Sequence, residues 1–183
     1  MSRQILFIQG GGPRVHDAWD DKLADSLKRE LGPGYDVRYP RMPHEDDPKF
    51  AEWKPAIGRE IAELSEGAVV VGHSLGGMML VHALAEEQPK TKLGGIVLID
   101  APFVGEGGWP NDEIAPKPDL GARLPDGVPV LLFHGEEDET APPAHARLYA
   151  QAIRQAEVHM LPGRDHQLNN DLREVAAIIR CAR

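Results

Sequence analysis

The sequence has 183 residues and a mass of 20.1 kDa, and a chain of this length typically folds as one domain that buries about two-thirds of its unfolded surface. Charged residues make up 27% and hydrophobic residues 42%, which is ordinary usage for a globular protein and argues against a disordered or membrane-embedded chain. Twenty basic against 29 acidic residues give a net charge of −9, and without a basic run this balance argues against nucleic-acid binding.

The first predicted strand, Ile5–Ile8, begins so early that no secretory signal peptide is expected before it. No apolar segment of the chain approaches the roughly 18 residues of a membrane span. A glycine run follows the strand as Gly10-Gly11-Gly12-Pro13. It does not match the dinucleotide fingerprint G-x-G-x-x-G, because Val15 stands at the last glycine position and Pro13 lacks an N–H for phosphate. No nucleotide or other cofactor is expected.

Strands and helices then alternate along the chain. Apolar runs rich in β-branched residues predict further strands at Tyr35–Tyr39, Ala68–Val71, Gly95–Ile99, Val128–Phe133 and Val158–Leu161. Apolar residues spaced by three and four predict helices at Trp19–Leu31, Phe50–Leu64, Leu75–Leu84, Leu148–Ile153 and Leu172–Ile179. We expect Asp17 to cap the first helix. The alternation predicts a single α/β domain over residues 1–183, with a parallel sheet covered by helices on both faces.

The stretch VVVGHSLGG leads from the third strand into the third helix and matches G-x-S-x-G at Gly72, Ser74 and Gly76. One interpretation is a plain turn in which Ser74 caps the following helix. The other is a nucleophile elbow, which needs small residues on both sides of the serine because neighbouring backbone approaches closely. Capping requires no flanking glycines, so the pattern favours the elbow. The helix that starts at Leu75 would then direct free N–H groups toward developing negative charge.

A serine nucleophile needs a histidine base that is oriented by an acid. Asp138 in LLFHGEEDETAPP follows the fifth strand, and His166 in LPGRDHQLNN follows the sixth. Both therefore lie at the sheet edge that carries Ser74. Two alternatives stay open for the acid: the acidic run around Asp138 can be solvated surface, and Asp100 also ends a strand, in GIVLIDAP.

The charge that develops on an acyl oxygen requires preorganised donors. The backbone N–H of Leu75 is the first expected donor. The second is expected from the loop after the first strand, where Gly11 is preferred and Gly12 is close behind.

The one long irregular stretch is Ala101–Gly127, which is dense in proline and glycine. It has few large apolar residues and too many prolines for an amphipathic lid helix. Phe103 and Trp109, together with Trp19, are candidates to line a small substrate pocket; the alternative is that they pack this loop onto the sheet.

No metal site is expected in the sequence. His44-Glu45-Asp46-Asp47 collects ligand types, but consecutive residues on an irregular segment do not converge on one ion, so a solvated acidic loop is favoured. The single cysteine, Cys181, excludes an internal disulfide and fits a cytoplasmic protein.

Three motifs, GHSLGG at Gly72–Gly77, HGEED at His134–Asp138 and DH at Asp165–His166, resemble those of the α/β-hydrolase superfamily. The chain is most similar to its small lidless serine hydrolases, including those named after retinoblastoma-binding protein nine. The resemblance implies about six mostly parallel strands, no large lid, and Ser74, Asp138 and His166 as a catalytic triad.

The chain departs from these relatives in two places. Gln9-Gly10 stands where family members often carry His-Gly. The first strand is expected to correspond to the one that is usually third, so the first antiparallel hairpin of larger members is expected to be missing. The expected function is hydrolysis of small carboxylic esters through an acyl-enzyme on Ser74. Thioester or amide hydrolysis by the same residues, and a non-catalytic binding protein that keeps the fold, are the alternatives.

Overall fold

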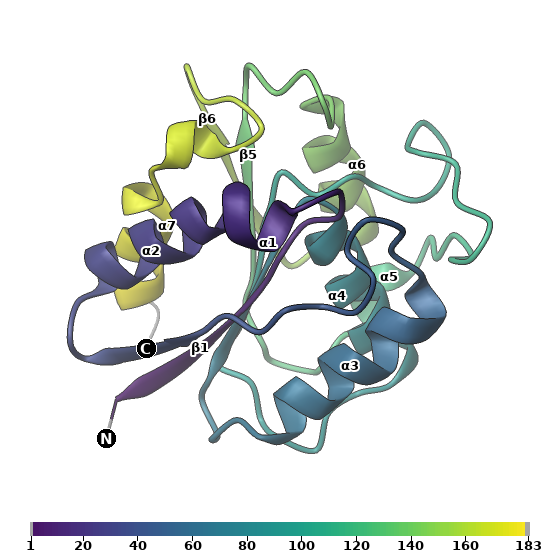
Figure 1. Ribbon diagram of the computed structural model, residues 1–183. Coiled ribbons are helices and arrows are strands. Elements are labelled where there is room, and N and C mark those ends of the chain that lie inside the picture. The colour runs from purple at the N-terminus through teal and green to yellow at the C-terminus, as the bar shows by residue number, and fades with distance from the viewer. Residues whose placement is uncertain (1, 182–183) are drawn as a thin grey trace.

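Six parallel strands form the sheet of this protein, whose computed structural model describes residues 2–181 (Figure 1). The strands are β1 (Arg3–Ile8), β2 (Tyr35–Arg38), β3 (Val69–His73), β4 (Gly95–Ile99), β5 (Val130–Gly135) and β6 (Ala156–Leu161). They lie in the order β2-β1-β3-β4-β5-β6, and every neighbouring pair is parallel. The predicted α/β class and the number of strands are confirmed.

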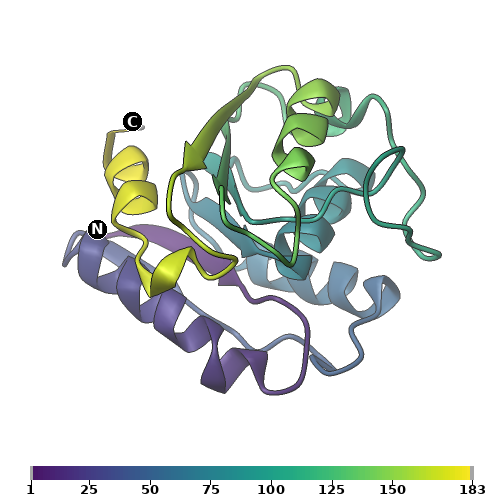
Figure 2. The same ribbon diagram turned by 90° about the horizontal axis from the view of Figure 1, so that it is seen from above.

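Helices cover both faces of the sheet (Figure 2). One face carries α2 (Asp20–Leu31) and α7 (Arg173–Cys181), and the other carries α3 (Phe50–Ala62), α4 (Leu75–Glu86) and α6 (Ala144–Ala152). Three short elements, α1 (Val15–Ala18), α5 (Leu120–Arg123) and the 3₁₀ turn η1 (Leu168–Asn170), were not predicted. Each spans only three or four residues, too few to give a periodic pattern.

The start of α2 differs from the sequence prediction. Asp17 does not cap this helix; it lies within α1, and its carboxylate pairs with Arg41 and His16. Trp19 has a non-helical φ of −128° and separates the two helices, so α2 begins at Asp20. The charged partners of Asp17 come from the chain around it and from the segment after β2, which sequence spacing does not reveal.

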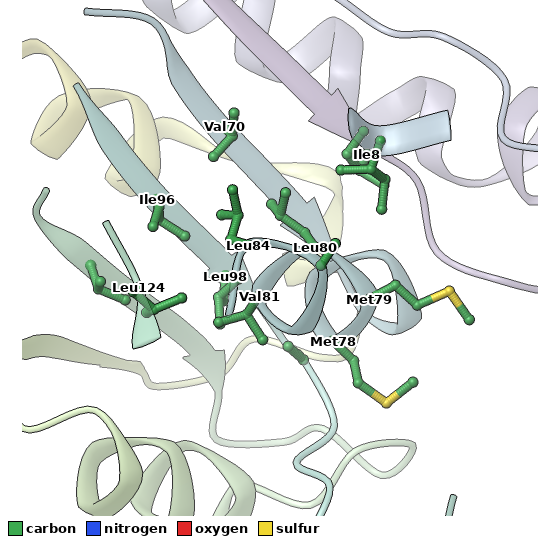
Figure 3. Close-up of a cluster of buried hydrophobic side chains, with 14 of the residues drawn as sticks. Ile8, Val70, Met78, Met79, Leu80, Val81, Leu84, Ile96, Leu98 and Leu124 are labelled. Atoms are coloured by element: carbon green, nitrogen blue, oxygen red, sulfur yellow. The ribbon is translucent and has the colours of Figure 1, made fainter. Parts of the chain in front are cut away.

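The strands are buried on both faces, and their side chains alternate between two apolar clusters. In β4, Ile96 and Leu98 pack toward α3 and α4, whereas Val97 and Ile99 pack toward α2 and α7. Figure 3 shows the first of these clusters, with side chains of α4 such as Leu80 lying over the sheet. Burial on both faces explains why these strands are continuous apolar runs rather than alternating ones.

The order of the strands reverses between β1 and β3. From β1 the chain moves outward to β2 and then returns to place β3 on the other side of β1. Ligands of open α/β sheets bind beyond the carboxyl ends of the strands at such a point. The residues there are the glycine run after β1 and Ser74 after β3.

The segment between β4 and β5 holds no long helix. Within it the structure has only α5 and a bridge between Val104 and Trp109. Two hydrogen bonds fasten it to α6: Tyr149 Oη donates to the Pro102 carbonyl at 2.8 Å, and the Phe103 amide donates to His145 Nδ1 at 2.8 Å. The predicted absence of a large lid is confirmed.

Across residues 2–181, no helix has the length and apolar character to span a bilayer.

Candidate active site

Ser74 sits on a sharp turn between β3 and α4. Its φ of 51° and ψ of −127° lie outside the regions that L-residues prefer, and its amide donates to the Ile99 carbonyl at 2.8 Å. A Cβ atom on Gly72 would overlap the backbone of Gly77, and one on Gly76 would overlap the carbonyl oxygen of Gln9. These glycines therefore let α4 pack closely against β3 and against the end of β1, as a nucleophile elbow requires.

The three predicted triad side chains meet at the carboxyl edge of the sheet. The Ser74 hydroxyl donates to Nε2 of His166 at 2.9 Å, and Nδ1 of His166 donates to Oδ2 of Asp138 at 2.7 Å. Ser74 is 8% exposed and Asp138 is buried, while the side chain of His166 stays partly open to solvent. This is a continuous chain of hydrogen bonds from hydroxyl to carboxylate.

Asp138 has a partner at each of its carboxylate oxygens. Oδ1 accepts from the amides of Thr140 and Ala141, both at 2.8 Å, and Oδ2 also lies 3.3 Å from Nε2 of His134. Burial acts to raise the pKa of Asp138, but the hydrogen bonds from His134, His166 and Ala141 outweigh it and hold the pKa well below its usual range. Asp138 is therefore a carboxylate at neutral pH.

Asp100 is buried nearby, but its carboxyl group has other hydrogen-bond partners than that of Asp138. Its Oδ1 accepts from the Gly135 amide at 2.7 Å, and its Oδ2 has no hydrogen-bond partner within residues 2–181. Burial raises the pKa of Asp100 to about 7. The geometry thus favours Asp138 over Asp100 as the partner of His166.

Asp100, His134 and Asp138 are also the described residues whose ligand atoms come close enough to hold a metal ion, within 4.8 Å of one another. The Nε2 atom of His134, however, donates to the Ala141 carbonyl at 2.8 Å, so that nitrogen carries a proton and is not free to ligate. In the other cluster considered, His44 pairs with Glu52 and Asp47 pairs with Lys49, on an exposed loop.

The glycine run after β1 leaves one amide free. The Gly10 amide donates to Oδ2 of Asp20 at 2.7 Å, and the Gly12 amide donates to the carbonyl of Glu45. Within the described chain, the amides of Gly11 and Leu75 have no acceptor. A Cβ atom on Gly11 would lie 3.5 Å from the Cβ of Leu75, so the two candidate donor residues are neighbours.

Gln9, which departs from the family pattern described above, makes hydrogen bonds through both polar atoms of its side chain. Its Oε1 accepts from the Met42 amide at 3.0 Å, and its Nε2 donates to Glu45 at 2.6 Å. Gln9 is fully buried. It therefore holds the glycine loop to the segment after β2.

The three candidate pocket residues lie in different environments. Phe103 is 8% exposed and meets Tyr149 edge to face at 5.1 Å, an arrangement that favours the packing interpretation. Trp109 is half-buried and meets His145 edge to face at 6.0 Å. Trp19 is 54% exposed, with the Lys22 ammonium 5.5 Å from its ring. A groove between α3 and the end of α4 contains none of these residues and none of the triad.

Two buried residues beside the triad were not identified from the sequence. Asp20 and His73 form an ion pair with 2.9 Å between Oδ2 and Nδ1. They are 53 residues apart in the chain. His73 occupies the first x position of G-x-S-x-G, which the motif leaves variable. An acid in the first turn of a helix is too common to signal a site.

Solved structures of other proteins share this fold. The closely matching folds include the ydeN gene product of B. subtilis, at 20% identity, with 99% of this chain and 98% of that chain covered and a TM-score of 0.77. Another is Est1E from Butyrivibrio proteoclasticus, solved with ferulic acid, at 16% identity, 97% and 86% coverage and a TM-score of 0.69. A third comes from work on the metagenome-derived lipolytic enzymes LipS and LipT, at 21% identity, 98% and 94% coverage and a TM-score of 0.68.

All three proteins are less than 25% identical to this chain, so the similarity shows a shared fold and no more. No curated protein matches the sequence significantly. The serine hydrolase family, in contrast, matches residues 6–171, which is most of the chain and includes the three predicted triad positions. The chain therefore belongs to the serine hydrolase family, as a small α/β hydrolase.

Proposed function

We propose that this protein hydrolyses small carboxylic esters through an acyl-enzyme on Ser74. The observation that carries the proposal is the hydrogen-bond chain from Ser74 through His166 to Asp138. Nε2 of His166 takes the hydroxyl proton while Oγ attacks the acyl carbon. Asp138 remains ionised, orients the imidazole through Nδ1 and stabilises the imidazolium that forms.

The tetrahedral intermediate carries its charge on the former carbonyl oxygen. We assign the N–H groups of Leu75 and Gly11 as the donors to that oxygen, because both amides are free and their residues are adjacent. The N-terminus of α4 adds a favourable dipole at the same place. His166 then donates its proton to the leaving alcohol, the acyl-enzyme forms, and water repeats the sequence to release the acid.

Two observations support a small ester as substrate. Est1E was solved with ferulic acid bound, and LipS and LipT are described as lipolytic enzymes, so esterases occur among the proteins of similar fold. The segment between β4 and β5 holds only one helix of four residues, which is too short to present a wide apolar face to lipid. We place Trp19 and Trp109 at the rim of the substrate pocket and assign Phe103 to its support.

The experiment that tests this proposal compares p-nitrophenyl acetate with the matching thioester and anilide, on wild type and Ser74→Ala. We expect ester hydrolysis to be fastest and the Ser74→Ala variant to lose it by roughly 10³-fold or more, with an unchanged melting temperature. Faster turnover of the thioester or anilide would assign the other substrate class. A folded wild type that turns over none of the three would favour a binding protein.

A further inference from the structure

Asp20 and His73 form a buried ion pair directly behind the triad. The side chains are 0% and 1% exposed, and Oδ2 of Asp20 lies 2.9 Å from Nδ1 of His73. Asp20 is the first residue of α2, where the helix dipole favours a negative charge. His73 is the last residue of β3 and the neighbour of Ser74 in the chain.

Both ring nitrogens of His73 face acceptors. Nδ1 faces the Asp20 carboxylate, and Nε2 lies 2.8 Å from the backbone carbonyl oxygen of His166. Because a carbonyl and an ionised carboxylate only accept hydrogen bonds, both nitrogens must donate, and the ring is an imidazolium. Burial acts to lower the pKa of His73, but the charge and hydrogen bond of Asp20 and the His166 carbonyl outweigh it and raise that pKa to about 9.

The remaining groups around His73 are consistent with this charge. Asp100, at the end of β4, adds a weaker attraction to the imidazolium. The ring of His166 lies 5.1 Å away between centroids and is tilted by 47°. Burial acts to raise the pKa of Asp20, but the charge and hydrogen bond of His73, together with the hydrogen bonds from Gly10 and Gln167, outweigh it and lower that pKa overall. The pair is therefore ionised at neutral pH.

The same carboxylate reaches two further parts of the site. Oδ2 of Asp20 also accepts from the Gly10 amide at 2.7 Å, next to the proposed oxyanion donor Gly11. Oδ1 accepts from Nε2 of Gln167 at 3.3 Å, next to the proposed base His166. One ion pair therefore contacts the glycine loop after β1, the end of β3 and the loop after β6.

We infer that Asp20 and His73 are positioning residues that hold the loop of the base, His166, in register with the oxyanion loop and with Ser74. The inference rests on the proposed function. The carbonyl that His73 binds belongs to His166 itself, so the ion pair fixes the backbone from which the base extends. A misplacement of about 1 Å in such a group costs up to about 100-fold in rate.

The first test is steady-state kinetics of Asp20→Asn with p-nitrophenyl acetate. The amide keeps the shape of the carboxylate but removes its charge, so His73 becomes neutral and loses one of its two donors. We expect kcat to fall about 10- to 100-fold, with KM within about threefold of wild type, since the substrate does not touch the pair. If Asp20→Asn does not fold, His73→Gln serves as the second variant, with the same expectation.

Ser26→Ala is the matched control. Ser26 is also a buried polar residue of α2, and its Oγ accepts from the Leu172 amide at 3.0 Å, on the segment before α7. The control removes a buried link between the same helix and the C-terminal part of the chain without touching the site. If Asp20→Asn has a kcat within threefold of Ser26→Ala, the pair is merely structural and the inference is wrong.

The second test is ¹⁵N NMR of the histidine ring nitrogens, which requires no catalysis. In wild type at pH 8, we expect both nitrogens of His73 to carry protons, and in Asp20→Asn we expect a neutral ring. A neutral His73 in wild type would overturn the inference by itself. A wild type without esterase activity but with a charged His73 would contradict the proposed function, and a positioning role for the pair would fall with it.

Discussion

Oδ2 of Asp138 lies 2.7 Å from Nδ1 of His166, whereas the buried carboxyl group of Asp100 is bonded to the amide of Gly135. Two acids therefore end neighbouring strands at the same edge of the sheet, and only one of them is hydrogen-bonded to the proposed base. Replacing each acid in turn therefore tests which of them orients His166.

Asp138→Asn should reduce kcat for p-nitrophenyl acetate by roughly 10³- to 10⁴-fold, because the amide favours the wrong tautomer of His166. Asp100→Asn keeps an oxygen that accepts from Gly135, and we expect its kcat to stay within about tenfold of wild type. Steady-state kinetics of the two isosteric variants checks this. The reverse ranking would assign Asp100 as the acid.

His166→Ala should lower kcat by several orders of magnitude and leave the free energy of unfolding nearly unchanged, because a loop histidine supports little core packing. His159→Ala is the matched variant on β6. The ring of His159 stacks on Phe133 at 4.6 Å, so its loss should cost about 1 kcal/mol of stability and little activity. Urea denaturation and ester kinetics on both variants separate the two roles. A large loss of activity in His159→Ala, with little loss in His166→Ala, would show that the base is misassigned.

Acyl chains of about two to six carbons should be preferred, without activation at a lipid interface. Each buried methylene contributes about 0.8 kcal/mol, and a shallow pocket without a lid buries few of them. The measurement is kcat/KM for p-nitrophenyl esters from acetate to palmitate, with and without micelles. A steady rise toward palmitate, or a jump above the micelle threshold, would contradict the small-substrate proposal.

His82→Leu should stabilise the protein at low pH. His82 is fully buried on α4, and neither of its ring nitrogens has a partner within residues 2–181. Burial, helped by the charge of Lys117, lowers the pKa of His82 to about 4. Between pH 6.5 and 4 the unfolded state takes up a proton that the folded state refuses, so this residue's contribution to stability is present above pH 6.5 and is lost as the pH falls.

The His82 effect reaches the order of 3 kcal/mol only as the pH approaches 4, where the folded state also begins to take up the proton, and it is smaller at pH 5.0. Leucine also removes two unpaired buried nitrogens, which should add roughly 1 kcal/mol at pH 7.5. Urea denaturation at pH 7.5, 6.0 and 5.0 gives the difference between variant and wild type. That difference should grow as the pH falls. A difference that stays constant would show that His82 takes up its proton as readily in the folded state as in the unfolded one.

The parts predicted from the sequence are those that local pattern determines. Runs such as Ile5–Ile8 and Gly95–Ile99 are apolar throughout because both faces of a parallel strand are buried, so their positions are visible without a structure. The positions of Ser74, Asp138 and His166 were predictable in the same way. Ser74 directly follows β3, Asp138 and His166 lie in the loops after β5 and β6, and parallel strands share one carboxyl edge.

The parts that were missed depend on contacts between distant segments. Asp17 was expected to cap a helix but pairs with Arg41, and the helix begins after a break at Trp19. The ion pair of Asp20 and His73 joins residues that are 53 positions apart, and neither residue type is unusual where it stands. Such pairs depend on burial and geometry, and a single sequence contains no periodic signal for either.

The central claim is that Ser74 is an activated nucleophile, and a fluorophosphonate probe followed by peptide mass spectrometry tests it most directly. We expect the probe to label wild type at one site, the Ser74 side chain, and to leave Ser74→Ala unlabelled while its melting temperature stays the same. A folded wild type that remains unlabelled, or a label on any residue other than Ser74, would contradict the account.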